Sequence, residues 1–118
     1  MTALRIEKVN EHIREELGVI LVKEAELKVG VFVTIVKVET TSNLRMARVA
    51  ISVFPETEAV SVQNILARTT YRIQRALNSR LHMRPMPMLL FELDTTAQSA
   101  QRIEEVLIAL QKERDISN

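Results

Sequence analysis

Arginine supplies almost all of the charge between Ala59 and Phe91 of this 118-residue chain. This segment contains no Asp, Glu or Lys, and its cationic side chains are Arg68, Arg72, Arg75, Arg80, Arg84 and His82. All fifteen carboxylates lie elsewhere in a protein whose net charge is only +1. A guanidinium group is planar, permanently charged and able to pair with phosphate through two hydrogen bonds. The composition therefore predicts a phosphate-binding surface, and above all one that binds nucleic acid.

The spacing of the arginines supports this prediction, although it leaves a second interpretation open. On a helix, Arg68, Arg72 and Arg75 lie near one face, whereas Ile73 and Leu77 point toward a core. The same pattern is typical of a solvated face that keeps a domain soluble, in which case the protein is a protein-interaction module. Nucleic-acid binding and protein interaction therefore both stay open from the residues alone.

Three further cations, Lys37, Arg45 and Arg48, lie on or beside a predicted hairpin. They form a possible secondary RNA-binding site that would extend the positive surface across the sheet. Charged residues on edge strands also prevent sheets from pairing with one another, which is the alternative reason for their presence.

Catalytic, metal and cofactor sites have no support in the sequence. The chain has no cysteine and only two histidines, His12 and His82, which lack the further ligands that a zinc site needs. No serine has an identifiable base partner, and no glycine-rich phosphate loop is present. We therefore expect a protein that is not an enzyme, with no catalytic residues, no metal and no cofactor.

The lack of cysteine, of a cleavable apolar leader and of a membrane-spanning apolar run favours a cytoplasmic monomer without membrane contact. Three Phe and one Tyr are too few to predict an aromatic platform for bases, so recognition of the backbone or of RNA shape is favoured.

Hydrophobic periodicity predicts the elements in order. These are a helix at 4–24, strands at 31–39 and 46–54, a helical region from about 56 to 84, a strand at 88–93, and a helix at 96–114 with a frayed tail at 115–118. The β-branched and aromatic run at Thr69–Tyr71 predicts a break or kink that makes two helices of the long region. The order α-β-β-α-α-β-α predicts a single α+β domain over 1–118, in which helices cover one face of a three-stranded sheet, as in a type II KH-like fold.

Six segments follow one another in a distinctive order and spacing: Arg5–Val9, Val33–Ile35, Ser42–Val49, Ile73–Leu77, Arg80–Arg84 and Pro87–Asp94. Together they resemble the ribosome-binding factor A family, a group of bacterial-type assembly factors of the small ribosomal subunit. The chain departs from the family pattern at Asn43, where Asp is usual, and at Thr69–Tyr71, where the family has an Ala-x-Gly junction. With no glycine at that junction, Tyr71 either stacks on a base or packs in the core.

The resemblance implies a non-enzymatic factor that binds 16S-type rRNA in the immature 30S subunit. It further implies that the factor promotes late maturation and pre-rRNA processing, and that a maturation GTPase is a possible second partner.

Overall fold

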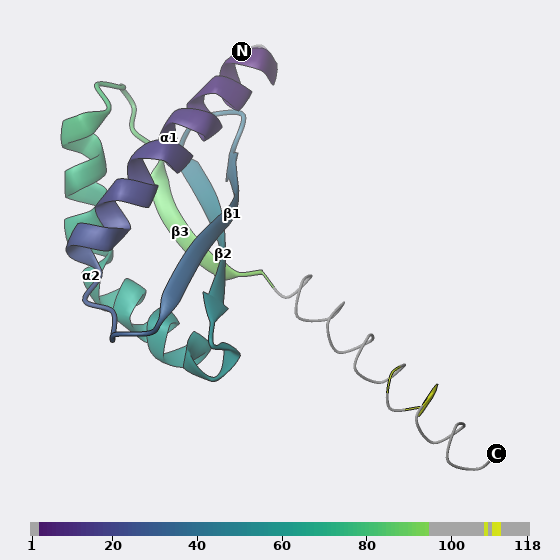
Figure 1. Cartoon of the computed structure of the whole chain (residues 1–118). Helices are drawn as coiled ribbons and strands as arrows, with labels where there is room; N and C mark the ends of the chain where they lie inside the picture. The colour runs from purple at the N-terminus through teal and green to yellow at the C-terminus, as the bar shows by residue number, and fades with distance from the viewer. Residues whose placement is uncertain (1–2, 95–107, 109, 112–118) are drawn as a thin grey trace.

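The computed structural model describes residues 3–94, 108, 110 and 111. The elements in chain order are α1 (Ala3–Glu24), β1 (Phe32–Thr40), β2 (Met46–Phe54), the 3-10 turn η1 (Glu56–Glu58), α2 (Ala59–Arg80) and β3 (Met88–Leu93). Both helices lie against the same face of the sheet (Figure 1). The predicted α+β fold with a three-stranded sheet is confirmed. Apart from the helical positions 108, 110 and 111, the helix predicted at 96–114 and its tail at 115–118 lie outside the described residues.

The sheet has the order β1-β2-β3 and combines two kinds of pairing. β1 and β2 form an antiparallel hairpin with a register irregularity between Ile35 and Lys37. β3 runs parallel to β2, with Met46 opposite Met88. A parallel neighbour requires a long crossover connection, and α2 provides it.

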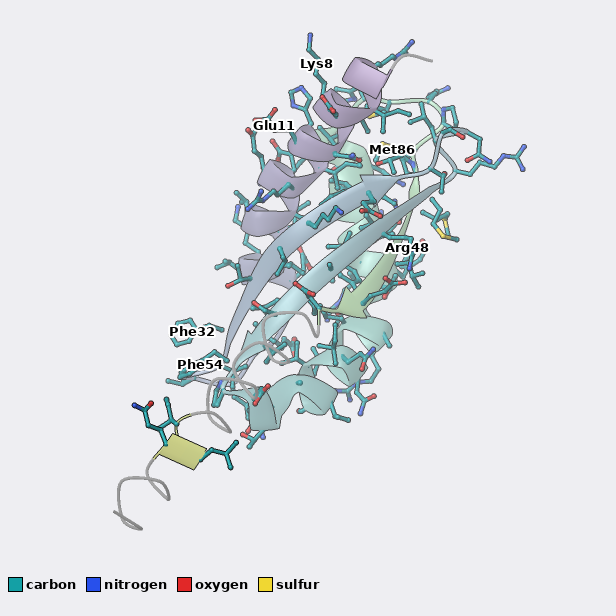
Figure 2. The ribbon with its side chains drawn as sticks, turned by 90° about the vertical axis from the view of Figure 1, so that its right-hand side faces the viewer. Lys8, Glu11, Phe32, Arg48, Phe54 and Met86 are labelled. Carbon is teal, nitrogen blue, oxygen red and sulfur yellow. The ribbon has the colours of Figure 1, made fainter. Side chains whose placement is uncertain are left out.

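The alternation along β2 determines which residues face the helices. Val49, Ile51 and Val53 are buried, as predicted, whereas Arg48 on the other face is exposed. Figure 2 shows this second, open face of the sheet, with Phe32 and Phe54 together at one end and Arg48 farther along.

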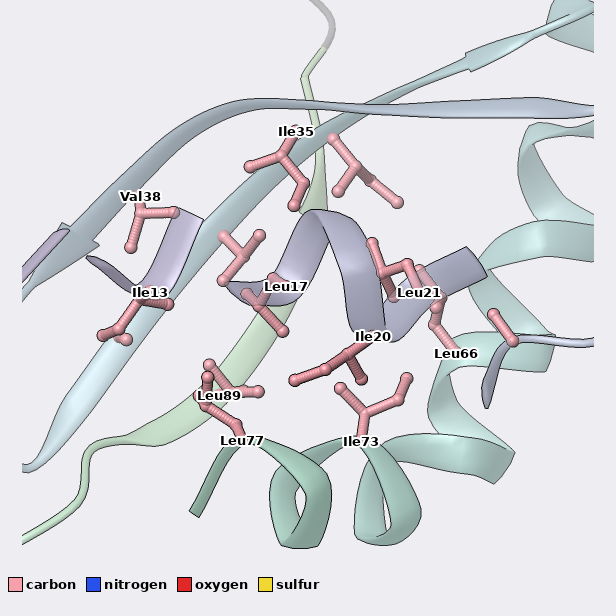
Figure 3. Packing of buried hydrophobic residues seen from close by; sticks show 14 of the residues in the cluster. Ile13, Leu17, Ile20, Leu21, Ile35, Val38, Leu66, Ile73, Leu77 and Leu89 are labelled. Atoms are coloured by element: carbon pink, nitrogen blue, oxygen red, sulfur yellow. The ribbon is translucent and has the colours of Figure 1, made fainter. Parts of the chain in front are cut away.

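The core lies between the sheet and the two helices, where side chains of α1, α2 and the strands meet (Figure 3). Ile13, Leu17 and Ile20 of α1 are almost fully buried against Ile73 and Leu77 of α2. Burying side chains of this size contributes roughly 1.5–3 kcal/mol each, so this layer provides much of the stability of the fold.

The prediction of two helices between β2 and β3 is wrong, because α2 is one continuous helix from Ala59 to Arg80. The hydroxyl of Thr69 donates to the carbonyl of Ile65 at 2.8 Å, and that of Thr70 donates to the carbonyl of Leu66 at 2.6 Å. Such bonds to the preceding turn bend a helix without breaking it. Figure 1 shows α2 changing direction part-way along its length.

The prediction that the helix continues to Arg84 is also wrong. α2 ends at Arg80, and Leu81 is already extended, with φ −108° and ψ 115°. The following residues connect α2 to β3, whose first amide, that of Met88, donates to the carbonyl of Arg45 at 2.9 Å. In this connection Leu81, Met83 and Met86 are partly buried against the core. Leu81 and Met83, two residues apart, share a side of an extended segment but not of a helix, so the chain leaves the helix four residues before Pro85.

Candidate nucleic-acid interface

The outer face of α2 carries three exposed guanidinium groups. Arg68, Arg72 and Arg75 are separated by four and three residues, which places them together on one side of a helix. The opposite side buries Leu66, Ile73 and Leu77. None of the three arginines takes part in an ion pair with any residue that the structure describes. We call Arg68, Arg72 and Arg75 the arginine face; its side chains are available to phosphate.

A glutamine beside the arginine face fixes the rotation of α2 about its own axis. Gln74 Nε2 donates to the carbonyl of Pro87 and to Asn78 Oδ1, both at 3.0 Å. Gln74 Oε1 accepts the N–H of Leu89 at 2.9 Å. Because Gln74 is attached to β3 in this way, the adjacent Arg75 is turned away from the sheet and toward solvent.

The other cations of the predicted site have different surroundings. Arg80 forms an ion pair with Glu16 of α1, with 3.0 Å between Nη1 and Oε2, so its charge is partly balanced within the fold. His82 and Arg84 are exposed, and they lie in the connection after α2 instead of on the helix. Both line a shallow depression of about 560 Å³ that Asn78 also borders. The structure therefore gathers Arg68, Arg72 and Arg75 on one face and sets His82 and Arg84 beyond its end.

On the open face of the sheet, two of the three hairpin cations are paired with carboxylates. Arg48 makes two hydrogen bonds to Glu92 of β3, at 3.2 Å from Nε and 3.1 Å from Nη2. Lys37 forms an ion pair with Glu39. The hydrogen bond from Lys37 and its positive charge, together with the charge of Arg48, hold the pKa of the Glu39 carboxyl below its ordinary value. Arg45 is exposed beside the turn and has no ion pair among the described residues.

Tyr71 is the functional candidate whose place the sequence left undecided. Its side chain is 76% exposed, which excludes the alternative that it packs in the core. It lies on the same half of α2 as the arginine face.

A separate groove of about 600 Å³ runs between the second half of α1 and β1. Its lining is mostly apolar and includes Leu21, Leu27 and Phe32, with Arg14 and Lys28 as its charged residues. Among the described residues, no cluster of three His, Asp or Glu side chains could hold a metal ion. No helix in that part of the chain is both long and apolar enough to cross a membrane.

The amino-acid sequence matches one known protein family over most of its length. The profile of ribosome-binding factor A matches residues 5–107. The chain belongs to the ribosome-binding factor A family. The ribosome-binding factor A of Chlorobium phaeovibrioides is 37% identical over 112 residues, which cover 92% of this chain and 93% of the relative.

Solved structures of the ribosome-binding factor A family share the fold. A solution structure of a Thermotoga maritima protein, described as a candidate ribosome binding factor A, is 25% identical. It aligns with a TM-score of 0.63 over 78% of this chain and 89% of that chain. A homology model of the Thermus thermophilus ribosome binding factor A, fitted into a cryo-EM map of its complex with the 30S subunit, aligns with a TM-score of 0.58 at 23% identity, over 80% of this chain and 96% of that chain.

Proposed function

We propose that this protein is a non-enzymatic ribosome assembly factor that binds 16S-type rRNA in the immature 30S subunit through the arginine face. The observation that carries the proposal is the set of three exposed arginines on a helix without a single acidic residue, none of them paired within the described part of the chain. Membership of the ribosome-binding factor A family and the 30S complex of the Thermus relative support the same partner.

Binding would work by charge and shape. Arg68, Arg72 and Arg75 would each neutralise backbone phosphates. Packing of α2 on the sheet and α1 would hold these arginines at a fixed spacing. Occupancy would stabilise an rRNA arrangement that precedes the mature one and so promote late maturation and pre-rRNA processing. The factor would leave once the mature arrangement, or a maturation GTPase, favours the unbound state. In this proposal residues 1–118 act as one cytoplasmic, monomeric domain without a cofactor.

The remaining cations have graded roles in the proposal. His82 and Arg84 would extend the contact beyond the end of α2, whereas Arg80, already paired with Glu16, would contribute less. Lys37 and Arg48 would contribute least, because their charges are balanced by Glu39 and Glu92. Arg45, which has no such partner in the described residues, is the strongest member of the secondary site.

The test compares two double variants that each remove two cations. We expect Arg72→Ala with Arg75→Ala to weaken co-sedimentation with immature 30S subunits at least about tenfold, because charged hydrogen bonds are worth roughly 1.5–3 kcal/mol each. Lys37→Ala with Arg48→Ala should change binding less than about threefold, because these charges are already balanced by Glu39 and Glu92 and are not available to phosphate. Thermal unfolding of both variants checks that they fold.

Two results would contradict the proposal. One is equal 30S binding by the folded Arg72→Ala, Arg75→Ala variant and the unmodified protein. The other is a complex that survives complete nuclease digestion of the RNA, which would favour a protein-interaction module instead.

A further inference from the structure

Tyr71 is an exposed aromatic side chain at the edge of the arginine face. It is the only tyrosine of the chain, and 76% of its surface is accessible. Its hydroxyl makes no hydrogen bond with any residue that the structure describes. An aromatic residue is also a poorer helix former than alanine, so neither packing nor helix propensity accounts for a tyrosine here.

The neighbours of Tyr71 on α2 show what it could bind. Arg68 precedes it by three residues and Arg75 follows it by four, the spacings at which helical side chains are adjacent. Arg72 is adjacent to both Arg68 and Arg75 on the helix surface, so arginines lie before and after the Tyr71 ring along α2. No carboxylate is present anywhere on α2. A ligand with a flat ring to stack on Tyr71 and a phosphate on each side of that ring would fit this surface.

The backbone of α2 cannot make the contact itself. α2 is a continuous helix through Thr69 and Tyr71, and its amides there are used within the helix. The hydroxyls of Thr69 and Thr70 are also engaged, since they donate to carbonyls of the preceding turn. Any ligand at this point must therefore be bound through the exposed side chains.

We propose that Tyr71 stacks on one unpaired nucleobase of the bound RNA while Arg68 and Arg75 hold the flanking phosphates. This inference rests on the proposed function and specifies the part of the RNA that the site takes. In a duplex the base faces are covered by their neighbours, so a ring on a helix surface can stack only on a base in a loop, a bulge or a single strand. A single ring accepts a single base, which is consistent with a protein that has too few aromatic residues for a platform.

The chain has one tyrosine and no tryptophan, so its tyrosine fluorescence reports on position 71 alone. The probes are a single-stranded oligoadenylate and a blunt RNA duplex of equal length. We expect the single strand to quench the emission, after correction for RNA absorption with N-acetyltyrosinamide, and the duplex to leave it nearly unchanged. Equal quenching by both probes, or none by either at saturation, would overturn the stacking.

Affinity measurements with labelled RNA test the same point by substitution. Base stacking on an aromatic residue is typically lost with a roughly 5- to 100-fold drop in affinity on change to alanine. We expect such a drop for Tyr71→Ala with the single strand but not with the duplex, and less than about twofold change for Tyr71→Phe, which keeps the ring. Because Tyr71 is exposed, both variants should keep the circular dichroism spectrum of the unmodified protein.

Failure of this inference is distinguishable from failure of the proposed function. If Tyr71→Ala binds the single strand normally while Arg72→Ala with Arg75→Ala does not, the stacking is wrong and the arginine face stands. If no arginine variant changes RNA binding either, the proposed function fails and the inference fails with it.

Discussion

At the scale of single residues, Leu44 shows two opposing effects in the turn between β1 and β2. Its φ of +59° lies in the left-handed region, which costs a non-glycine residue about 1–2 kcal/mol. Its side chain is only 4% exposed, and burial of a leucine contributes roughly 1.5–3 kcal/mol. Asn43 helps to hold this turn, because its Oδ1 accepts the N–H of Arg45 at 3.1 Å and the hydroxyl of Thr41 at 2.7 Å. The amide thus provides the acceptor that an Asx turn needs, and burial outweighs the backbone cost.

We therefore expect Leu44→Asn to lower the free energy of unfolding by about 1–3 kcal/mol, although asparagine adopts this backbone conformation readily. Leu44→Met keeps the apolar volume and should cost less than about 1.5 kcal/mol. Urea unfolding measures both values. An asparagine variant as stable as the unmodified protein would show that backbone strain dominates at this position.

At the scale of elements, side-chain amides attach each helix to the sheet. Asn10 of α1 accepts the N–H of Thr40 at the end of β1 at 2.9 Å, and the Thr40 hydroxyl as well. Gln74 of α2 holds the start of β3 through Pro87 and Leu89. Since Met88 donates toward β2, the N–H of Leu89 points to the other side of this edge strand, where Gln74 accepts it.

Loss of the Gln74 side chain would leave the carbonyl of Pro87 and the amide of Leu89 without these bonds. We expect Gln74→Ala to destabilise the protein by about 1–3 kcal/mol. Hydrogen exchange at the Leu89 amide should become faster. Asn78→Ala removes only the exposed partner of Gln74 and should cost less than about 0.5 kcal/mol. Unchanged protection of Leu89 in the Gln74 variant would contradict this role.

At the scale of the whole molecule, the helix side and the open face of the sheet differ in whether their cations are paired with carboxylates. The arginine face points away from the sheet and has no ion pairs within the described residues. On the open face of the sheet, Lys37 and Arg48 are matched by Glu39 and Glu92. The lowered pKa of Glu39 means that this pair contributes stability above the carboxyl's ordinary pKa, and the contribution disappears as pH falls through the lowered value. At neutral pH Lys37 and Arg48 on the open face are thus balanced by carboxylates, whereas the three arginines of the arginine face are unmatched among the described residues.

Salt dependence should reveal this difference. If each phosphate contact contributes a slope of roughly −0.7 to −0.9, Arg72→Ala with Arg75→Ala should flatten the plot of log affinity against log salt by about 1.4–1.8. Lys37→Ala with Arg48→Ala should flatten it by less than about 0.5. Fluorescence anisotropy of labelled RNA gives both slopes. Equal flattening by the two variants would place RNA on both faces.

The alternation along β2 and the three-to-four spacing in α1 were sufficient to predict the strands, the first helix and the residues that face the core. These patterns are local, because the side-chain direction repeats every 2 residues in a strand and about every 3.6 in a helix. Local propensity at Thr69–Tyr71 predicted a break or kink; the break is wrong because α2 stays continuous, while the threonine hydroxyls bond to the preceding turn in the way that bends a helix. Local propensity misled again after Arg80, because Leu81 and Met83 both pack against the core, and residues two apart share a side of an extended segment but not of a helix.

The sequence by itself determined the α+β class, the core-facing residues and the concentration of arginine between β2 and β3. Only the tertiary structure decided which of the cations are unpaired and that Tyr71 is exposed. The partners of Arg48 and Arg80 are 44 and 64 residues away in the chain, so no local pattern predicts these pairs. Parallel pairing of β3 with β2 brings Glu92 to Arg48, and packing of α1 on α2 brings Glu16 to Arg80. Charge distribution on the surface therefore follows from how the elements pack, whereas the elements themselves follow from local periodicity.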